Sequence, residues 1–230
     1  MTLLPERTRA NLAGVRFRIE AACRRSGRNA DSVTLVAVTK SVGPEEARAL
    51  SSLGVRDFGE NRVQELARKS SALAGLPVRW HMIGHLQRNK VQDLLPHSTI
   101  VHSLESAALA EVLSRRAGER ELEIDVLIEV NVAGEASKYG VAPADAGALA
   151  EKVAGFPALR LRGLMTMAPL AEDPETVRPV FAALRELAAT LARDLPPGAM
   201  SELSMGMTQD FEAAVEEGAT MVRIGTALFG

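Results

Sequence analysis

The sequence has little of several features that would point to a particular class of function. Its one cysteine, Cys23, cannot form an internal disulfide, so a reducing cytoplasm is the expected compartment. Aromatic residues make up 3% of the chain and the formal net charge is −2, which argues against a nucleic-acid surface. No apolar stretch reaches the roughly 20 residues of a membrane-spanning helix, and the N-terminus lacks the apolar core of a signal peptide. We therefore expect a cytoplasmic protein that binds neither nucleic acid nor membrane.

What the sequence does have is a regular alternation of strand-like and helix-like segments. An amphipathic helix is expected at residues 5–26, and apolar, strand-like stretches then alternate with helical patterns. The strand-like stretches lie at residues 34–40, 55–61, 78–84, 99–104, 123–132, 159–167 and 202–207, and the eighth lies within the closing segment 220–230. Such alternation implies parallel pairing, because each crossover needs a covering helix.

Eight strand–helix units predict an α/β fold, a single (β/α)8 TIM barrel over residues 1–230 with an extra N-terminal helix. The alternative is an open doubly wound sheet, but residues 39–44, TKSVGP, are not its glycine-rich turn. Among the helical segments, residues 86–95 are predicted to form one helix. Asp210 is predicted to cap a short helix that ends at Glu217.

In such barrels the active face is the C-terminal end of the strands, where the first strand delivers Lys40. Two interpretations of this lysine are open. Its stem can lie on apolar surface while the ammonium reaches water. Alternatively, the amine can lose its proton and form a Schiff base with a carbonyl ligand.

The last two strands deliver a second set of candidate residues. The segments SMGMT (204–208) and RIGT (223–226) are rich in Ser, Gly and Thr, which suit either simple turns or a phosphate held by backbone N–H groups. Arg223 stands between Val222 and Ile224, so it either faces the helices or is paired inside the barrel. Pyridoxal 5′-phosphate (PLP) offers one partner for each feature: an aldehyde, a phosphate and a ring nitrogen.

Other kinds of site are less well supported. His81 and His85 are four residues apart, but Gly84 and the strand pattern argue against a shared helical face, so no metal site is expected. Ser204 lacks the G-x-S-x-G elbow of a serine hydrolase.

Taken together, the motifs resemble one known family. The stretches LVAVTK, FGENRVQE, WHMIGHLQRNK, VNVAGEASKYG, RGLMTM and LSMGMTQDFEAAVEEGATMVRIGTALFG, in this order, are similar to the pyridoxal phosphate homeostasis protein (YggS or PROSC) family. That family looks like the N-terminal barrel of alanine racemase standing alone. The racemase's β-rich domain and its catalytic tyrosine are therefore expected to be missing here.

The resemblance implies that Lys40 holds PLP as a Schiff base and that Arg223 faces the ring nitrogen. It places further residues around the phosphate, near the cofactor or in the barrel interior: Asn61, His81, Met165, Ser204, Gly206, Gly225 and Thr226. One departure concerns the residues after Lys40, where the family commonly has a second basic residue. Here Ser41, Val42 and Gly43 follow, which puts in doubt any role of that charge in cofactor exchange.

The function implied by the resemblance is to carry and buffer PLP, and so to maintain vitamin B6 and amino-acid homeostasis. No catalytic residue is expected. The partners would be PLP and PLP-dependent apoenzymes, and the protein would be a monomer. Two alternatives stay open: a slow PLP-dependent amino-acid racemase, and a cofactor-free aldolase that uses Lys40 on a sugar phosphate.

Overall fold

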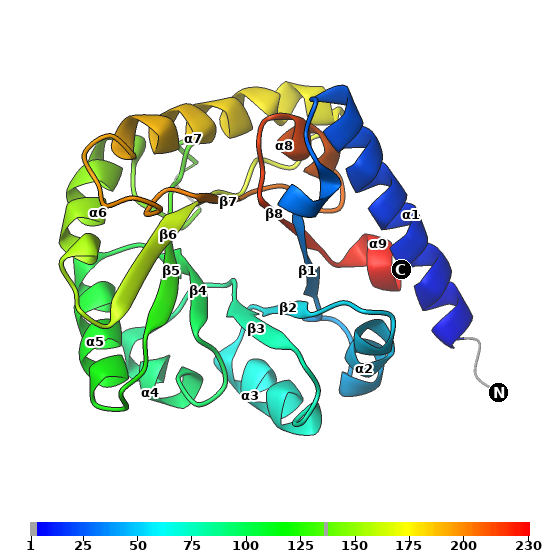
Figure 1. Cartoon of the computed structure of the whole chain (residues 1–230), viewed down its shortest axis with the longest axis horizontal. Helices are drawn as coiled ribbons and strands as arrows, with labels where there is room; N and C mark the ends of the chain where they lie inside the picture. Colours follow the sequence, from blue (N-terminus) through cyan, green and yellow to red (C-terminus); the bar gives the residue numbers. More distant parts are fainter. Residues whose placement is uncertain (1–3, 136–137) are drawn as a thin grey trace.

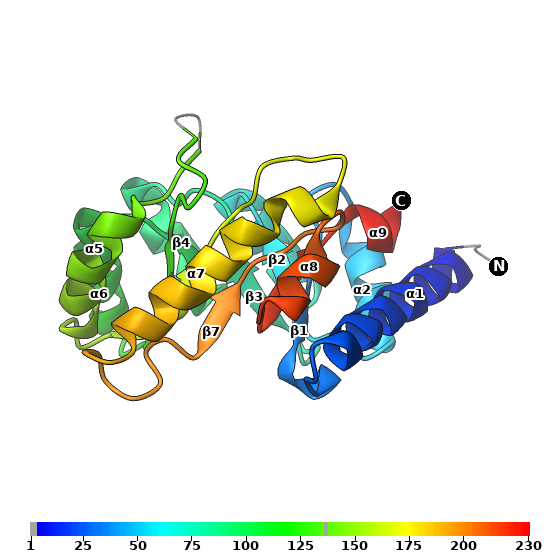
Figure 2. The ribbon, with the colours of Figure 1, turned by 90° about the horizontal axis from the view of Figure 1, so that it is seen from above.

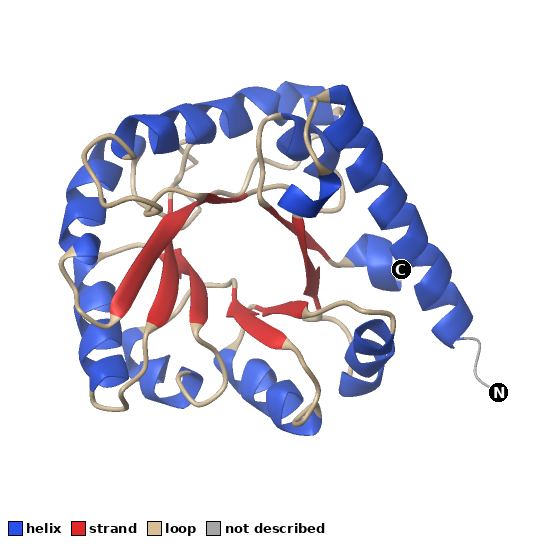
Figure 3. Ribbon diagram, in the orientation of Figure 1, coloured by secondary structure: helices blue, strands red, loops and turns tan. Residues whose placement is uncertain are grey.

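The strands form where the sequence has short apolar runs that end in glycine or polar residues. The computed structural model describes residues 4–135 and 138–230. Its strands are β1 (Thr34–Val38), β2 (Asp57–Glu60), β3 (Arg79–Met82), β4 (Ile100–Leu104), β5 (Ile124–Glu129), β6 (Leu159–Met165), β7 (Glu202–Ser204) and β8 (Met221–Ile224). Each strand pairs in parallel with the next, and β8 pairs with β1, which closes the barrel (Figure 3). The predicted α/β barrel is confirmed.

Helices surround the barrel as an outer ring (Figure 1). They are α1 (Leu4–Arg25), α2 (Pro44–Ser52), α3 (Val63–Ala72), α4 (Val91–Leu94), α5 (Ala107–Gly118), α6 (Ala146–Ala154), α7 (Arg178–Leu191), α8 (Phe211–Glu216) and α9 (Thr226–Phe229). Short 3-10 turns are η1 (Ala30–Ser32), η2 (Arg88–Lys90), η3 (Pro143–Asp145) and η4 (Pro174–Val177). No helix in the described ranges is long and apolar enough to cross a membrane.

The extra N-terminal helix is confirmed as α1, which lies across the outside of α8 and α9 (Figure 2). Its apolar stripe of Leu12, Val15 and Ile19 is buried in the apolar core. Arg18 adds an ion pair with Glu212 of α8 at 2.8 Å. The helix therefore covers the place where the two ends of the barrel sheet meet.

One local prediction was wrong, and a second was right only in the position of the residue. Residues 86–95 form η2 and the one-turn helix α4 rather than one helix, because the polar run Gln87–Lys90 offers no apolar face before Val91. Asp210 does stand at the N-cap position of α8, but its Oδ1 accepts from the backbone N–H of Met207, at 2.6 Å, and from no helical N–H.

The two faces of the sheet carry different side chains, because successive residues of a strand point to opposite sides. Outward-facing residues such as Ala37, Phe58 and Val222 pack against the helices in one apolar core. The inner face carries polar groups. The side chains of His102 in β4 and Ser204 in β7 are hydrogen-bonded although these strands are not neighbours, so the bond must cross the barrel interior.

Candidate functional site

Lys40 lies directly after β1 at the C-terminal end of the barrel and is exposed. The residue before it is fixed firmly. Thr39 donates from its backbone N to Gly59 O at 3.0 Å and from its hydroxyl to Glu60 Oε1 at 2.6 Å. Its carbonyl accepts from the fully buried ammonium of Lys69 at 2.6 Å. The sequence therefore anchors the backbone beside Lys40 while leaving the Lys40 side chain free.

The neighbouring strand ends bring two predicted site residues next to Lys40. Gly225, after β8, lies so close to β1 that an added Cβ would be 3.3 Å from the carbonyl oxygen of Val38. On the other side, the exposed Asn61 directly follows the end of β2. The exposed Thr226 follows Gly225 as the first residue of α9. Lys40, Asn61, Gly225 and Thr226 thus form one stretch of the barrel rim.

The loops after β7 and β8 meet at the same rim. Gly206 adopts φ +90°, and a Cβ there would approach the Cβ of Ala214 to 2.5 Å, so only glycine fits. The Thr208 hydroxyl accepts from the backbone N–H of Ala227 at 3.3 Å and joins the two loops. These turns offer backbone N–H groups and small hydroxyls, a combination that suits an anion.

Arg223 faces the barrel interior, which decides between the two orientations left open by the sequence. It is 4% exposed, and its NH1 donates to Ser204 Oγ at 2.6 Å while its NH2 donates to Thr166 O at 2.8 Å. Burial lowers the pKa of Arg223 to about 10, against the opposing influence of Glu129 and Asp210, so the guanidinium is cationic at neutral pH. Met165, one residue before Thr166, is fully buried.

Below Arg223, polar side chains continue across the interior. Ser204 Oγ lies 2.8 Å from His102 Nδ1, and His102 Nε2 lies 2.8 Å from His81 Nδ1. His81 Nε2 lies 2.9 Å from Asp57 Oδ1. Burial, with His81 and Arg223 nearby, lowers the pKa of His102 well below its usual value. Ser204 therefore has two interior partners, and its predicted place beside a phosphate stays a prediction.

Sequence reasoning missed Asp57, His102 and Glu129. Glu129 is the last residue of β5 and is in register with Met165 and Ser204, so it faces the interior. Burial and the nearby Glu105 raise its pKa to about 7, against the effect of Arg223. The signal that pointed to Arg223, a charge inside an apolar strand, was also present at Glu129.

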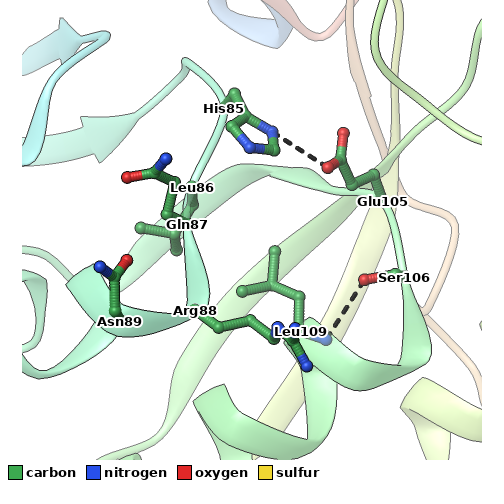
Figure 4. Close-up of a pocket in the computed structure, with 8 residues that line it drawn as sticks. All are labelled: His85, Leu86, Gln87, Arg88, Asn89, Glu105, Ser106 and Leu109. Atoms are coloured by element: carbon green, nitrogen blue, oxygen red, sulfur yellow. Dashed lines mark hydrogen bonds and ion pairs between the residues drawn. The ribbon is translucent and has the colours of Figure 1, made fainter.

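A separate hollow of about 480 Å³ lies beside the turn after β3 and the start of α5 (Figure 4). His85 faces Glu105 there at 3.0 Å, and its ring stacks on Tyr139 at 4.3 Å between centroids. The hollow contains none of the predicted site residues. Within the described residues, no group of three His, Cys, Asp or Glu side chains could hold a metal ion.

A closed parallel barrel with an exposed lysine after β1 and a buried, interior arginine in β8 defines the class of this protein. The family described as alanine racemase, N-terminal domain, matches residues 11–230. Pyridoxal phosphate homeostasis proteins of Aquifex aeolicus and Pseudomonas aeruginosa are 47% and 44% identical to it, over 95% and 96% of this chain and 96% and 94% of theirs. The chain belongs to the family of pyridoxal phosphate homeostasis proteins, within the alanine racemase N-terminal domain family.

Solved structures agree with this assignment. PipY of Synechococcus elongatus PCC7942, in a structure with PLP bound, is 37% identical, with a TM-score of 0.84 over 99% of this chain and 100% of that one. Alanine racemase of Clostridium difficile 630 is 15% identical, with a TM-score of 0.78 over 98% of this chain and 56% of the racemase. At that identity the racemase supports the fold alone.

Proposed function

We propose that this chain binds PLP covalently through Lys40 and carries and buffers the cofactor without catalytic turnover of its own. One observation carries the proposal: an exposed lysine and a buried, firmly held arginine lie at the same end of one barrel. The relatives named as homeostasis proteins and the PLP-bound structure of PipY support it.

The residues present fit the groups of PLP. When bound, PLP supplies an aldehyde that links to an amine and a ring that withdraws electrons. Lys40 would provide the amine, Arg223 would face the ring nitrogen, and the turns after β7 and β8 would hold the phosphate. The further residues proposed to line the site are Asn61, His81, Met165, Ser204, Gly206, Gly225 and Thr226.

Arg223 would influence the chemistry that bound PLP can support. A guanidinium donates hydrogen bonds and does not give up its proton at neutral pH, and the pKa of about 10 at Arg223 is consistent with this. The arginine would leave the ring nitrogen unprotonated, which makes the ring a weaker electron sink than one held protonated by aspartate. The proposed recipients are PLP-dependent apoenzymes. We further propose that residues 1–230 act as one monomeric barrel in the cytoplasm.

The experiment is a transfer assay with PLP-loaded protein and an apoenzyme whose activity reports delivery. We expect delivery from the unaltered protein, none from Lys40→Ala, and unchanged delivery from Lys152→Ala, which removes an exposed lysine of α6. Delivery at the same rate from Lys40→Ala would contradict the proposal.

A slow PLP-dependent racemase is the second candidate, and Glu129 favours it. A carboxyl group with a pKa of about 7 that faces the barrel interior is suited to proton transfer near neutral pH. Exchange of an amino acid's α-hydrogen with deuterated solvent, lost in both Lys40→Ala and Glu129→Gln, would favour the enzyme. Absence of exchange across the common amino acids would favour the carrier.

The hydrogen bonds of Arg223 remove one argument against the aldolase alternative. A buried arginine without PLP needs other partners inside the barrel, and Ser204 and the Thr166 carbonyl are such partners. Borohydride trapping with a sugar phosphate, but not with PLP, would favour an aldolase.

A further inference from the structure

The interior side chains between Arg223 and Asp57 form a continuous row whose two ends differ in chemistry. A guanidinium can only donate hydrogen bonds, and an ionised carboxylate can only accept them. Asp57 is ionised, because hydrogen bonds from His81 and Arg79 outweigh the effect of burial and lower its pKa. The ends therefore determine the direction of each hydrogen bond between them.

At the Arg223 end, NH1 donates to Ser204 Oγ at 2.6 Å. The hydroxyl hydrogen of Ser204 is then free to point at His102 Nδ1, 2.8 Å away. Because His102 accepts at Nδ1, a neutral His102 carries its proton on Nε2. The lowered pKa of His102 is consistent with the neutral form.

The second half of the row continues in the same direction. His102 Nε2 donates to His81 Nδ1 at 2.8 Å, so a neutral His81 carries its own proton on Nε2. That proton points at Asp57 Oδ1, 2.9 Å away. Both histidines are then Nε2–H tautomers, and each nitrogen in the row has one partner.

The reverse direction leaves a group unsatisfied. A proton added at His81 Nδ1 would face His102 Nε2, and His102 would then have to donate from Nδ1 to Ser204. Ser204 Oγ would receive hydrogens from both His102 and Arg223, and its own hydroxyl hydrogen would lose its acceptor. Leaving a buried polar group unpaired costs about 1–3 kcal/mol, so the direction from Arg223 to Asp57 is favoured.

The row also connects the two ends of the barrel. Asp57 and Arg79 are the first residues of β2 and β3, and they line a cavity of about 120 Å³ at the N-terminal end of the strands. Arg79 donates from NH2 to Asp57 Oδ2 at 3.0 Å, and its Nε lies 2.8 Å from Asp57 Oδ1 in the same ion pair. Arg223, at the other end, contacts Ser204 and Thr166 at the C-terminal ends of β7 and β6.

We propose that Asp57, His81 and His102 are positioning residues that act through Ser204, in a hydrogen-bonded row of one direction, to hold the Arg223 guanidinium at the cofactor site. The role of the row in PLP binding rests on the proposed function. The direction of the row and the immobilisation of Arg223 do not.

The first test uses the ligand-free protein and ¹⁵N NMR of its histidine side chains. The chain has four histidines, so His85→Gln and His97→Gln identify the signals that do not belong to the row. We expect His102 to be a neutral Nε2–H tautomer at pH 7, with the proton of His81 on Nε2. A proton on Nδ1 of His102, or a charged His102, would overturn the proposal.

The second test compares Asp57→Asn with Asp125→Asn. Asp125 lines the same cavity and carries the same charge, but it pairs with Arg160 at 2.8 Å and is outside the row. In Asp57→Asn an amide can donate to His81, as happens when the aspartate of a serine-protease triad is replaced by asparagine. We expect altered histidine tautomers and faster rotation of the Arg223 guanidinium, seen in its side-chain N–H signals. Asp125→Asn should change neither.

The cofactor gives a third readout. We expect Asp57→Asn to weaken PLP binding about tenfold, equivalent to one charge-assisted hydrogen bond, and to shift the visible absorbance of the bound cofactor. Asp125→Asn should change binding less than about twofold. Unchanged Arg223 signals and unchanged PLP binding in Asp57→Asn would overturn the positioning role. If the unaltered protein took up no PLP, the proposed function would fail, while the histidine and Arg223 signals would still decide this inference.

Discussion

The inner and outer faces of the barrel sheet are built from the same strands but do different work. The outer face is an apolar core in which Phe58, Leu66 and Leu113 are completely buried against strands and helices. The inner face carries a row of hydrogen-bonded polar groups that ends at Arg223, beneath the lysine of the rim. In this barrel the fold depends on one side of each strand, and the candidate site depends on the other.

One buried ion pair on the outer side is an exception to this contrast. Breaking it is predicted to have the largest effect on the free energy of unfolding. Lys69 of α3 lies on the outer side, where its ammonium is buried and contacts Glu60 Oε1 at 2.5 Å. Lys69→Met would leave a buried carboxylate without its cation, and we expect a loss of about 3–5 kcal/mol in the free energy of unfolding. Urea denaturation measures this loss.

The matched control replaces both members of the pair. Lys69→Met combined with Glu60→Leu should recover most of the lost stability, because no unpaired charge then remains. If the double variant were less stable than Lys69→Met alone, the pair would not act as a unit.

A nearby apolar residue gives the next largest effect. Leu66 lies one turn before Lys69 on α3 and is fully buried. Leu66→Ala should cost about 2–4 kcal/mol, through lost burial and the cavity left behind. In urea denaturation, the slope of the free energy of unfolding against urea concentration should be unchanged. A cost below about 1 kcal/mol would mean that the outer core closes over the gap.

Glu129, on the inner face, should make the stability of the folded protein depend on pH. Its pKa is raised from 4.5 to about 7 in the folded protein. The folded state therefore holds a proton that the unfolded state loses between these values, so this contribution to stability is full below pH 4.5 and is lost as the pH rises through 7. The change is on the order of 3 kcal/mol.

Glu129→Gln removes this titration. Relative to the unaltered protein without ligand, the variant should gain stability as the pH rises from 4.5 to 7.5, as measured by denaturation at each pH. If the free energies of unfolding of the two proteins differed by the same amount across this pH range, the raised pKa of the buried Glu129 carboxyl group would be contradicted.

The smallest effect is expected at a solvent-exposed ion pair near the N-terminal end of the barrel. Arg160 lies near the start of β6. It pairs with Asp125 at 2.8 Å and with Glu123 at 3.1 Å, and half of its side chain is exposed. Arg160→Ala should cost less than about 1 kcal/mol, since solvent screens such pairs. A larger loss in urea denaturation, persisting at high salt, would indicate a structural role at the barrel's N-terminal end.

The contrast between the outer and inner faces also explains how much of the fold could be predicted from the sequence alone. Each strand was predicted, because outward-facing apolar residues repeat along the chain and glycine or polar residues mark the strand ends. Residues 86–95 were predicted poorly, because Leu86, Val91 and Leu94 suggested a helical stripe although the residues at 87–90 are polar. Local periodicity could not show that the backbone turns there.

Without the resemblance to a family, candidate site residues could be proposed only where one residue was conspicuous by itself. Lys40 and Arg223 are charges at the end of an apolar strand or inside one, so the sequence marked both. The row from Ser204 through His102 and His81 to Asp57 joins four strands. Its contacts depend on strand register and barrel closure, which no local pattern contains.

The central claim is that Lys40 carries the cofactor, and one measurement tests it most directly. The protein would be incubated with PLP, reduced with borohydride, digested and examined by peptide mass spectrometry. We predict a yellow protein whose visible band disappears on reduction, with a single pyridoxyl adduct on Lys40. A colourless protein, or an adduct found only on other lysines, would contradict the account.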